Sequence, residues 1–173
     1  IFFEPILGEG GVVPIDLSVI KGIREICDEH DLLMMCDEVQ CGMGRSGKWF
    51  AHQWAEIKRD VITMAKGLAG GVPVGAVIVS EKANIFKPGN HGSTFGGNPL
   101  AMRAALETLS IIEDEKLVEN ALEVGKKLKK ALSKSLNGFP GVRGIRGKGL
   151  MLGIVLDRDA HDILELGLKA GLT

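Results

Sequence analysis

The segment LLMMCDE at residues 32–38 decides the fold class of this chain. Five apolar residues in a row, followed at once by two carboxylates, are typical of a short strand that is buried on both faces of a parallel sheet. Residues 61–65 and 74–79 are apolar runs of the same kind, and we expect them to be strands of the same sheet. Ligands bind at the carboxyl ends of strands in such sheets, so Asp37 stands where a site residue is expected.

Helical patterns separate these runs. Residues 1–5 predict another strand, which leads through the glycine-rich residues 8–11 into a helix with apolar residues at helical spacing over residues 17–27. Asp16 is the expected N-cap of that helix. The alternation of strands and helices predicts an α/β fold with a mostly parallel sheet and flanking helices.

The second half of the chain has a different character. Residues 100–112 and 117–136 predict two helices, and Asp114 is the expected cap of the second. We interpret the lysines of the second helix as a solvated face, with Glu123 one turn before Lys127 as an ion-pair partner. A hairpin is predicted over residues 142–156, and Asp159 begins a last helix.

These patterns predict three parts. A partial large domain covers residues 1–97, connecting helices cover residues 98–136, and the start of a smaller α+β C-terminal domain covers residues 137–173.

The composition is that of a globular chain. Of 173 residues, 45% are hydrophobic and 25% are charged, which excludes disorder. A net charge of −1 argues against nucleic acid or a membrane surface as the main partner, and the uncharged residues 67–80 are too few to span a bilayer. The first residues lack the basic start of a signal peptide. The three cysteines have no Cys-x-x-Cys spacing, which predicts free thiols and a cytoplasmic protein.

Three places carry side chains that are suited to chemistry. Asp37 is either a site carboxylate or the acceptor of a local turn. Lys66 lies between an apolar run and a glycine-rich turn, where desolvation would lower its pKa and make it a nucleophilic amine. The alternative for Lys66 is a solvated surface lysine. Residues 91–98, a polar glycine-rich loop before a helix, suit a phosphate or are only a capped loop.

Together the three places form the constellation of a pyridoxal phosphate site. The lysine forms the Schiff base, the aspartate pairs with the pyridinium nitrogen, and the hydroxyl-bearing loop holds the phosphate. Residues 144–149 look similar to a phosphate loop but precede a strand, so we discount them. The histidines and cysteines show no metal-ligand spacing, so no metal site is expected.

At this point four ordered motifs resemble one family. EPILGEGG at 4–11, DEVQCGMGR at 37–45, AKGL at 65–68 and GSTFGGNPLA at 92–101 are similar to the class III pyridoxal-phosphate aminotransferases. Within that class the resemblance is greatest to the acetylornithine aminotransferases. It covers essentially the whole chain, including RGKGLMLG at 146–153, which resembles the hairpin of the family's small domain. The resemblance implies the fold-type-I transferase fold.

The resemblance also implies roles at the cofactor. Lys66 would form the Schiff base and move the proton between the substrate Cα and the cofactor. Asp37 would keep the pyridine nitrogen protonated, and Val39 would pack on the ring face. Gln40 would bond the phenolic oxygen, and Glu38 is counted among the cofactor-binding residues with them.

Other residues would act on the phosphate and the substrate. Thr94 would reach the phosphate of the neighbouring subunit's cofactor in a homodimer, and Ser93 would lie near the substrate. Glu9 matches a glutamate that pairs with a C-terminal arginine of the family and switches between substrates. The resemblance implies transfer of the δ-amino group of N-acetylornithine to 2-oxoglutarate, a step of arginine biosynthesis.

Family chains are more than twice as long, so we expect this chain to be a central to C-terminal fragment that is inactive by itself. Their N-terminal phosphate loop and their carboxylate-binding arginine have no match here. Ornithine, succinylornithine and 4-aminobutyrate remain alternative amino donors. A catalytically silent α/β binding domain is the alternative of another class, although such a domain has no chemical reason to keep both Asp37 and Lys66.

Overall fold

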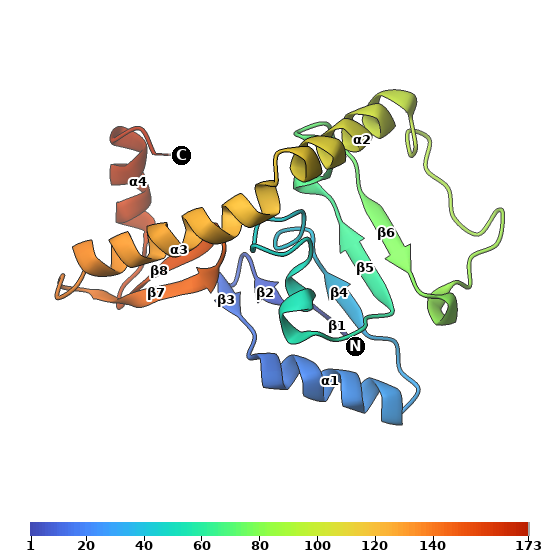
Figure 1. The fold of residues 1–173 in the computed structure, drawn as a ribbon, viewed down its shortest axis with the longest axis horizontal. Helices are drawn as coiled ribbons and strands as arrows, with labels where there is room; N and C mark the ends of the chain where they lie inside the picture. The colour runs from blue at the N-terminus through green and yellow to red at the C-terminus, as the bar shows by residue number, and fades with distance from the viewer. Residues whose placement is uncertain (173) are drawn as a thin grey trace.

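The structure is a computed structural model, which describes residues 1–172. The first half of the chain is built around a central sheet. Within these residues the strand order is β1 (Phe2–Phe3), β4 (Met35–Asp37), β5 (Val61–Met64) and β6 (Ala76–Val79) (Figure 1). The first three strands are mutually parallel, and β6 runs antiparallel to β5. The expected α/β fold with a mostly parallel sheet is therefore confirmed.

Helix α1 (Leu17–Glu29) begins where the sequence predicts. The Asp16 side chain accepts a hydrogen bond of 2.8 Å from the Ser18 N–H, which satisfies one of the free amides of the first turn. The apolar face of the helix buries Ile20 and Cys27 against Met34, which lies just before β4. The amphipathic pattern thus explains both the helix and the side of it that packs on the sheet.

The expectation of a doubly buried strand at residues 74–79 is wrong. Strand β6 is antiparallel, and 59% of Val77 and 46% of Ile78 remain exposed. Only β5 pairs with it among the described residues. An apolar run is compatible with either orientation, because periodicity does not record the direction of the partner strand.

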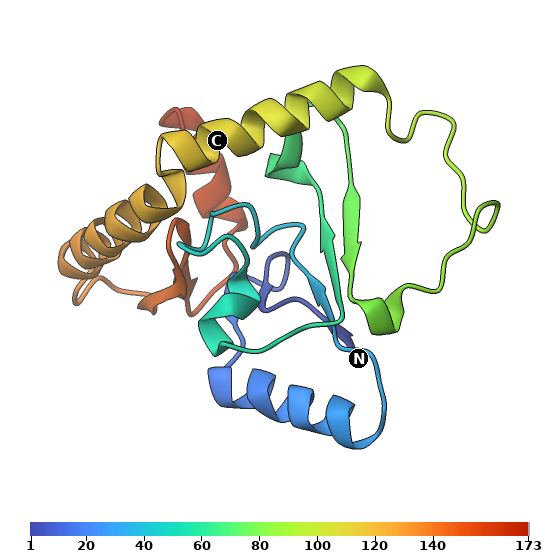
Figure 2. The same ribbon diagram turned by 45° about the vertical axis from the view of Figure 1, so that its right-hand side comes forward.

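Two helices connect the sheet to the C-terminal part. Helix α2 (Pro99–Asp114) starts after the Asn98 cap, and α3 (Leu117–Ser135) follows it almost end to end (Figure 2). Asp114 is the last residue of α2 and not the expected cap; Lys116 precedes α3 in a left-handed conformation with no side-chain cap. Glu123 pairs with Lys126 at 2.8 Å instead of the expected Lys127, because positions three and four apart are both neighbours on a helix.

Helix α3 lies over the predicted hairpin, β7 (Val142–Lys148) and β8 (Met151–Leu156), and α4 (His161–Lys169) follows. A second, small hairpin joins β2 (Ile6–Leu7) to β3 (Val13–Pro14). The division at residues 97 and 136 stays a prediction. No helix among residues 1–172 is both long and apolar enough to cross a membrane.

Three short 3₁₀ segments complete the described chain. They are η1 (Ala51–Ala55), η2 (Lys66–Ala69) and η3 (Glu81–Ala83).

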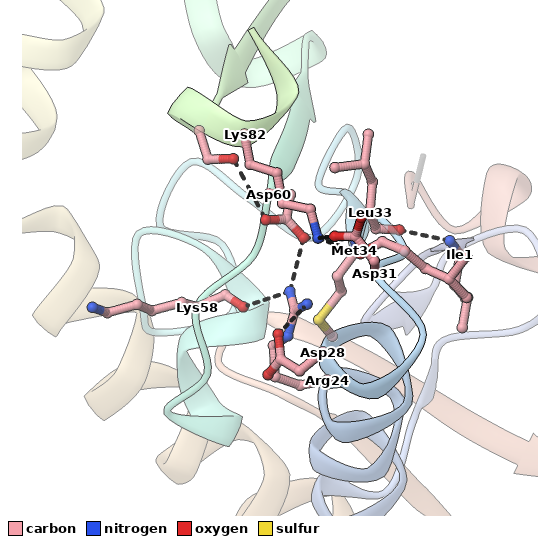
Figure 3. Close-up of polar contacts among 11 residues, drawn as sticks. Ile1, Arg24, Asp28, Asp31, Leu33, Met34, Lys58, Asp60 and Lys82 are labelled. Atoms are coloured by element: carbon pink, nitrogen blue, oxygen red, sulfur yellow. Dashed lines mark hydrogen bonds and ion pairs between the residues drawn. The ribbon is translucent and has the colours of Figure 1, made fainter.

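A polar cluster around Asp60 connects the sheet to α1 just before β5 begins, at the end of the sheet opposite the carboxyl ends of β4 and β5 (Figure 3). One oxygen of Asp60 accepts from Arg24 Nη1 and from the Met34 N–H, each at 2.8 Å. Arg24 also pairs with Asp28 on the same helix at 2.7 Å. Burial alone would raise the pKa of Asp60, but the bonds from Arg24 and Met34 outweigh burial and lower it.

Candidate functional site

The carboxyl ends of β4 and β5 form the core of the candidate site. Asp37 is in register with Thr63, and the Glu38 N–H donates to the Thr63 carbonyl at 2.9 Å. Lys66 begins η2 two residues after β5 ends. A side chain on Gly67 would touch Met43, so the turn after β5 lies against the loop after β4. The two parallel strands therefore bring Asp37 and Lys66 to one edge of the sheet.

Lys66 differs from the expectation in its burial. Its side chain is exposed, so the residues described here do not supply the desolvation that the apolar run suggested. The backbone has φ of +45°, a left-handed conformation that costs a residue other than glycine about 1–2 kcal/mol. Such strain is common at functional residues, where the surrounding fold imposes it.

Asp37 fits both interpretations that the sequence left open. One oxygen, Oδ1, accepts a 3.0 Å hydrogen bond from the Val39 N–H and shapes the turn after β4. Among residues 1–172 nothing donates a hydrogen bond to Oδ2. The half-buried carboxylate therefore keeps one oxygen for a ligand.

Gln40, in the loop that follows Asp37, contacts Glu9. Gln40 Nε2 donates to Glu9 Oε1 at 3.0 Å, although the two residues are 31 positions apart. A side chain on Gly8 would overlap the Gln40 amide, so a larger residue at this position would displace that amide. Strand β4 and the β2–β3 hairpin thus place an amide and a carboxylate side by side.

Glu38 points the other way, into the protein. It has no exposed surface, and its carboxylate accepts from the backbone N–H groups of Ala51 and His52, each at 2.8 Å. His52 Nδ1 lies 2.9 Å away and Cys41 Sγ lies 3.0 Å away. These partners occupy the Glu38 carboxylate and connect it to the loop after β4, and the cofactor-binding role of Glu38 stays a prediction.

The thiols near this network are poor nucleophiles. Burial, with the Glu38 charge added, raises the pKa of Cys41 far above its ordinary value. Burial likewise raises the pKa of Cys36 to about 12. All three cysteines are free and buried, so the expectation of free thiols is confirmed.

Ser93 and Thr94 lie outside the two loops that follow β4 and β5. Both are exposed in the long excursion between β6 and α2 (Figure 1). Ser93 Oγ accepts from the Gly96 N–H at 3.1 Å, and Ser93 lines a small cavity with Pro73, Val74 and Gly75. Neither hydroxyl contacts Asp37 or Lys66 among the described hydrogen bonds.

Two further residues near the site were missed by sequence reasoning. His52 is buried beside Glu38, and Arg146 of β7 donates from Nε and Nη2 to the Gly11 carbonyl at 2.9 and 2.6 Å. No spacing or periodicity marks either residue, because both act through contacts between distant parts of the chain. The sequence signals for Arg146 are its place in the glycine-rich residues 144–149, discounted as a phosphate site, and in the motif at 146–153, and neither indicates a bond to Gly11.

The whole chain, residues 1–173, matches the family model described as aminotransferase class III. The chain belongs to the class III aminotransferase family. These are pyridoxal-phosphate enzymes, and in the Toxoplasma gondii ornithine aminotransferase pyridoxal phosphate partially occupies the active site. That structure is 35% identical with a TM-score of 0.91, over 99% of this chain and 42% of its own.

Acetylornithine aminotransferases are also similar to this class III chain. Acetylornithine aminotransferase 1 of Bordetella bronchiseptica is 51% identical over 99% of this chain and 44% of its own length. The structure of the Elizabethkingia anophelis enzyme matches with a TM-score of 0.90 at 36% identity, over 98% of this chain and 44% of its own. The chain therefore spans less than half the length of these relatives. Their structures confirm the fold-type-I transferase fold.

Proposed function

We propose that this chain is part of an acetylornithine aminotransferase, which transfers the δ-amino group of N-acetylornithine to 2-oxoglutarate in arginine biosynthesis. The observation that carries the proposal is the amine of Lys66 at the same sheet edge as the half-buried carboxylate of Asp37. Identity of 51% to a Bordetella acetylornithine aminotransferase supports this donor. Ornithine is the second candidate donor, because ornithine aminotransferases share the fold with a TM-score of 0.92 at 38% identity.

The side chains at the sheet edge suit pyridoxal phosphate. When bound, this cofactor supplies an aldehyde that condenses with amines and a ring that accepts electrons. Lys66 offers an exposed amine, Asp37 offers a carboxylate oxygen for a protonated ring nitrogen, and Gln40 offers an amide for the phenolic oxygen. Val39, half-buried between Asp37 and Gln40, offers an apolar side chain for the ring face.

Each residue then has a separate task in the proposed reaction. Lys66 would hold the cofactor through its amine and would move a proton to and from the substrate carbon that carries the amino group. Asp37 would hold a positive charge at the ring nitrogen, and this charge would stabilise negative charge that develops at that carbon. Glu9 would receive or reject the charged end of a substrate, and we assign Ser93 to substrate binding.

The remaining parts of the proposal concern the assembly. Thr94 projects with the exposed residues 91–97, which suits a contact with the phosphate in a neighbouring subunit of a homodimer. A cytoplasmic location fits three free, buried thiols, because oxidising compartments favour disulfides.

The test uses a protein of the relatives' full length that carries this chain. Formation of glutamate from 2-oxoglutarate is measured with N-acetylornithine, ornithine, succinylornithine and 4-aminobutyrate as donors. We expect N-acetylornithine to give the largest kcat/KM, and Lys66→Ala to abolish turnover together with the visible absorbance of the bound cofactor. Lys58→Ala, which removes another exposed lysine side chain, is the control and should retain both. Full turnover in Lys66→Ala would refute the assignment, and preference for ornithine would favour the second candidate.

A further inference from the structure

The loop that carries Glu9 contains a strained residue. Val12 has φ of +57°, and Gly11 before it has φ of +96°. A β-branched residue is a clear outlier in the left-handed region, because its branched side chain crowds the backbone there. Such a conformation persists only where the surroundings impose it.

Arg146 forms two hydrogen bonds with the loop at this point. Its Nε and Nη2 atoms both donate to the carbonyl of Gly11, the peptide group that joins Gly11 to Val12, at 2.9 and 2.6 Å. A side chain on Gly11 would lie 2.7 Å from Nη2, and the φ of +96° also favours glycine at this position. Among the ion pairs of the described residues Arg146 has no carboxylate partner. Its side-chain hydrogen bonds both go to the Gly11 carbonyl.

The hairpin that carries Arg146 also supports the loop by packing. On β8, a side chain on Gly153 would meet Val12 at 3.1 Å, so the strand lies directly against the strained residue. Met151 of the same strand is buried with Ile6 and Cys41, and Val12 packs on this cluster. The hairpin therefore touches both the Glu9 loop and the loop that follows Asp37.

We propose that Arg146 is a positioning residue, which holds the Gly8–Val12 loop so that the Glu9 carboxylate stays against Gln40. The inference rests on the proposed function only for its consequence in catalysis, namely discrimination between substrates at Glu9. A planar guanidinium can direct two N–H groups at one carbonyl, whereas a lysine ammonium cannot reproduce that fork. Without these two hydrogen bonds, we expect Val12 to relax to a negative φ and the Glu9 carboxylate to separate from the Gln40 amide.

Hydrogen–deuterium exchange on the full-length protein tests the structural part. The reporters are three amides of the loop. The Gly8 N–H donates to Glu4 Oε2, and the Gly11 and Val12 N–H groups both donate to the Gly8 carbonyl. Arg146→Met should speed their exchange by about tenfold or more, because a charge-assisted hydrogen bond is lost. Arg146→Lys should rescue little of the protection.

Arg143→Met is the matched control on the same strand. Arg143 pairs with Asp157 at 3.1 Å and does not touch the loop, so its loss should leave the reporters unchanged. Unchanged exchange in Arg146→Met would overturn the proposal. So would faster exchange spread evenly over the chain, which would mean that Arg146 serves only global stability.

Kinetics of the full-length protein test the catalytic part. Arg146→Met should raise KM for the substrates by about tenfold and alter the ratio of KM values between amino donor and 2-oxoglutarate, with kcat and the cofactor's visible absorbance nearly kept. A fall in kcat with unchanged KM values would overturn the role. If the unaltered protein transfers no amino group, the proposed function fails, whereas the exchange experiment still decides whether Arg146 holds the loop.

Discussion

Asp37 divides its two carboxylate oxygens between the fold and the site. Oδ1 is used by the Val39 N–H, and Oδ2 has no donor among the described residues. The neighbouring Glu38 has the opposite arrangement, because its carboxylate is wholly enclosed by donors of the protein. Two adjacent acids of one motif therefore have different tasks, and only their surroundings distinguish them.

Asparagine at position 37 separates these tasks. Its amide oxygen can still accept from the Val39 N–H, so the turn should survive, but the negative charge is gone. In the full-length protein Asp37→Asn should lower kcat by about a hundredfold or more and raise KM far less, because the lost interaction stabilises charge in the transition state. Steady-state kinetics check this, with Asp28→Asn as a control far from the site. Normal kcat with weakened cofactor binding would show that Asp37 is only a tether.

At the scale of elements, Asp60 joins α1, β4 and β5 at the base of the sheet. The bonds from Arg24 and Met34 lower the pKa of Asp60 against the opposing effect of burial. A carboxyl whose pKa is lower in the folded state stabilises the fold above its unfolded pKa of about 3.9. This contribution is lost as the pH falls through the folded value.

Asp60→Asn should therefore lower the free energy of unfolding by about 1–3 kcal/mol at pH 7, because the negative charge that accepts the hydrogen bonds from Arg24 and Met34 is lost. The difference from the unaltered chain should shrink as the pH falls below about 4. Urea unfolding between pH 7 and pH 2.5 measures both. Asp28→Asn changes an exposed partner of the same Arg24 and should cost less than about 0.5 kcal/mol. A difference that stays constant down to the lowest pH would contradict the linkage.

At the scale of the whole molecule, the candidate site is open on several sides. Lys66 and Thr94 are exposed, and so are the large apolar side chains of Phe95 and Leu100, at 81% and 72%. These residues alone give an anionic cofactor few enclosed, charge-assisted hydrogen bonds. Exposed apolar side chains in such a group are typical of surfaces that other protein segments cover.

The chain of 173 residues should therefore hold pyridoxal phosphate weakly when it is purified alone. Each missing charge-assisted hydrogen bond to a phosphate costs about 1.5–3 kcal/mol, so two of them weaken binding by about a hundredfold or more. The check is to mix the chain with the cofactor, desalt it and record visible absorbance and amino transfer. The full-length protein is the positive control. A stoichiometric band that survives desalting, with turnover, would contradict this prediction.

Local patterns were sufficient for the helices, apart from the start of α3, and for the sheet edge that carries Asp37 and Lys66. Asp16 caps α1 because a short side chain reaches the amide two residues on, which is a purely local interaction. The apolar run before Asp37 and the one before Lys66 form parallel neighbours, and parallel strands end on the same side. The motifs around these two residues were also sufficient to indicate the family.

Contacts between distant segments decided the rest. The direction of β6, the exposure of Lys66 and the burial of Glu38 against His52 depend on what each residue meets in space, which no local period records. The bond between Arg146 and the Gly11 carbonyl joins residues 135 positions apart. Its geometry exists only once the β7–β8 hairpin lies against the Glu9 loop, because a directional hydrogen bond requires both partners to be placed by their own packing.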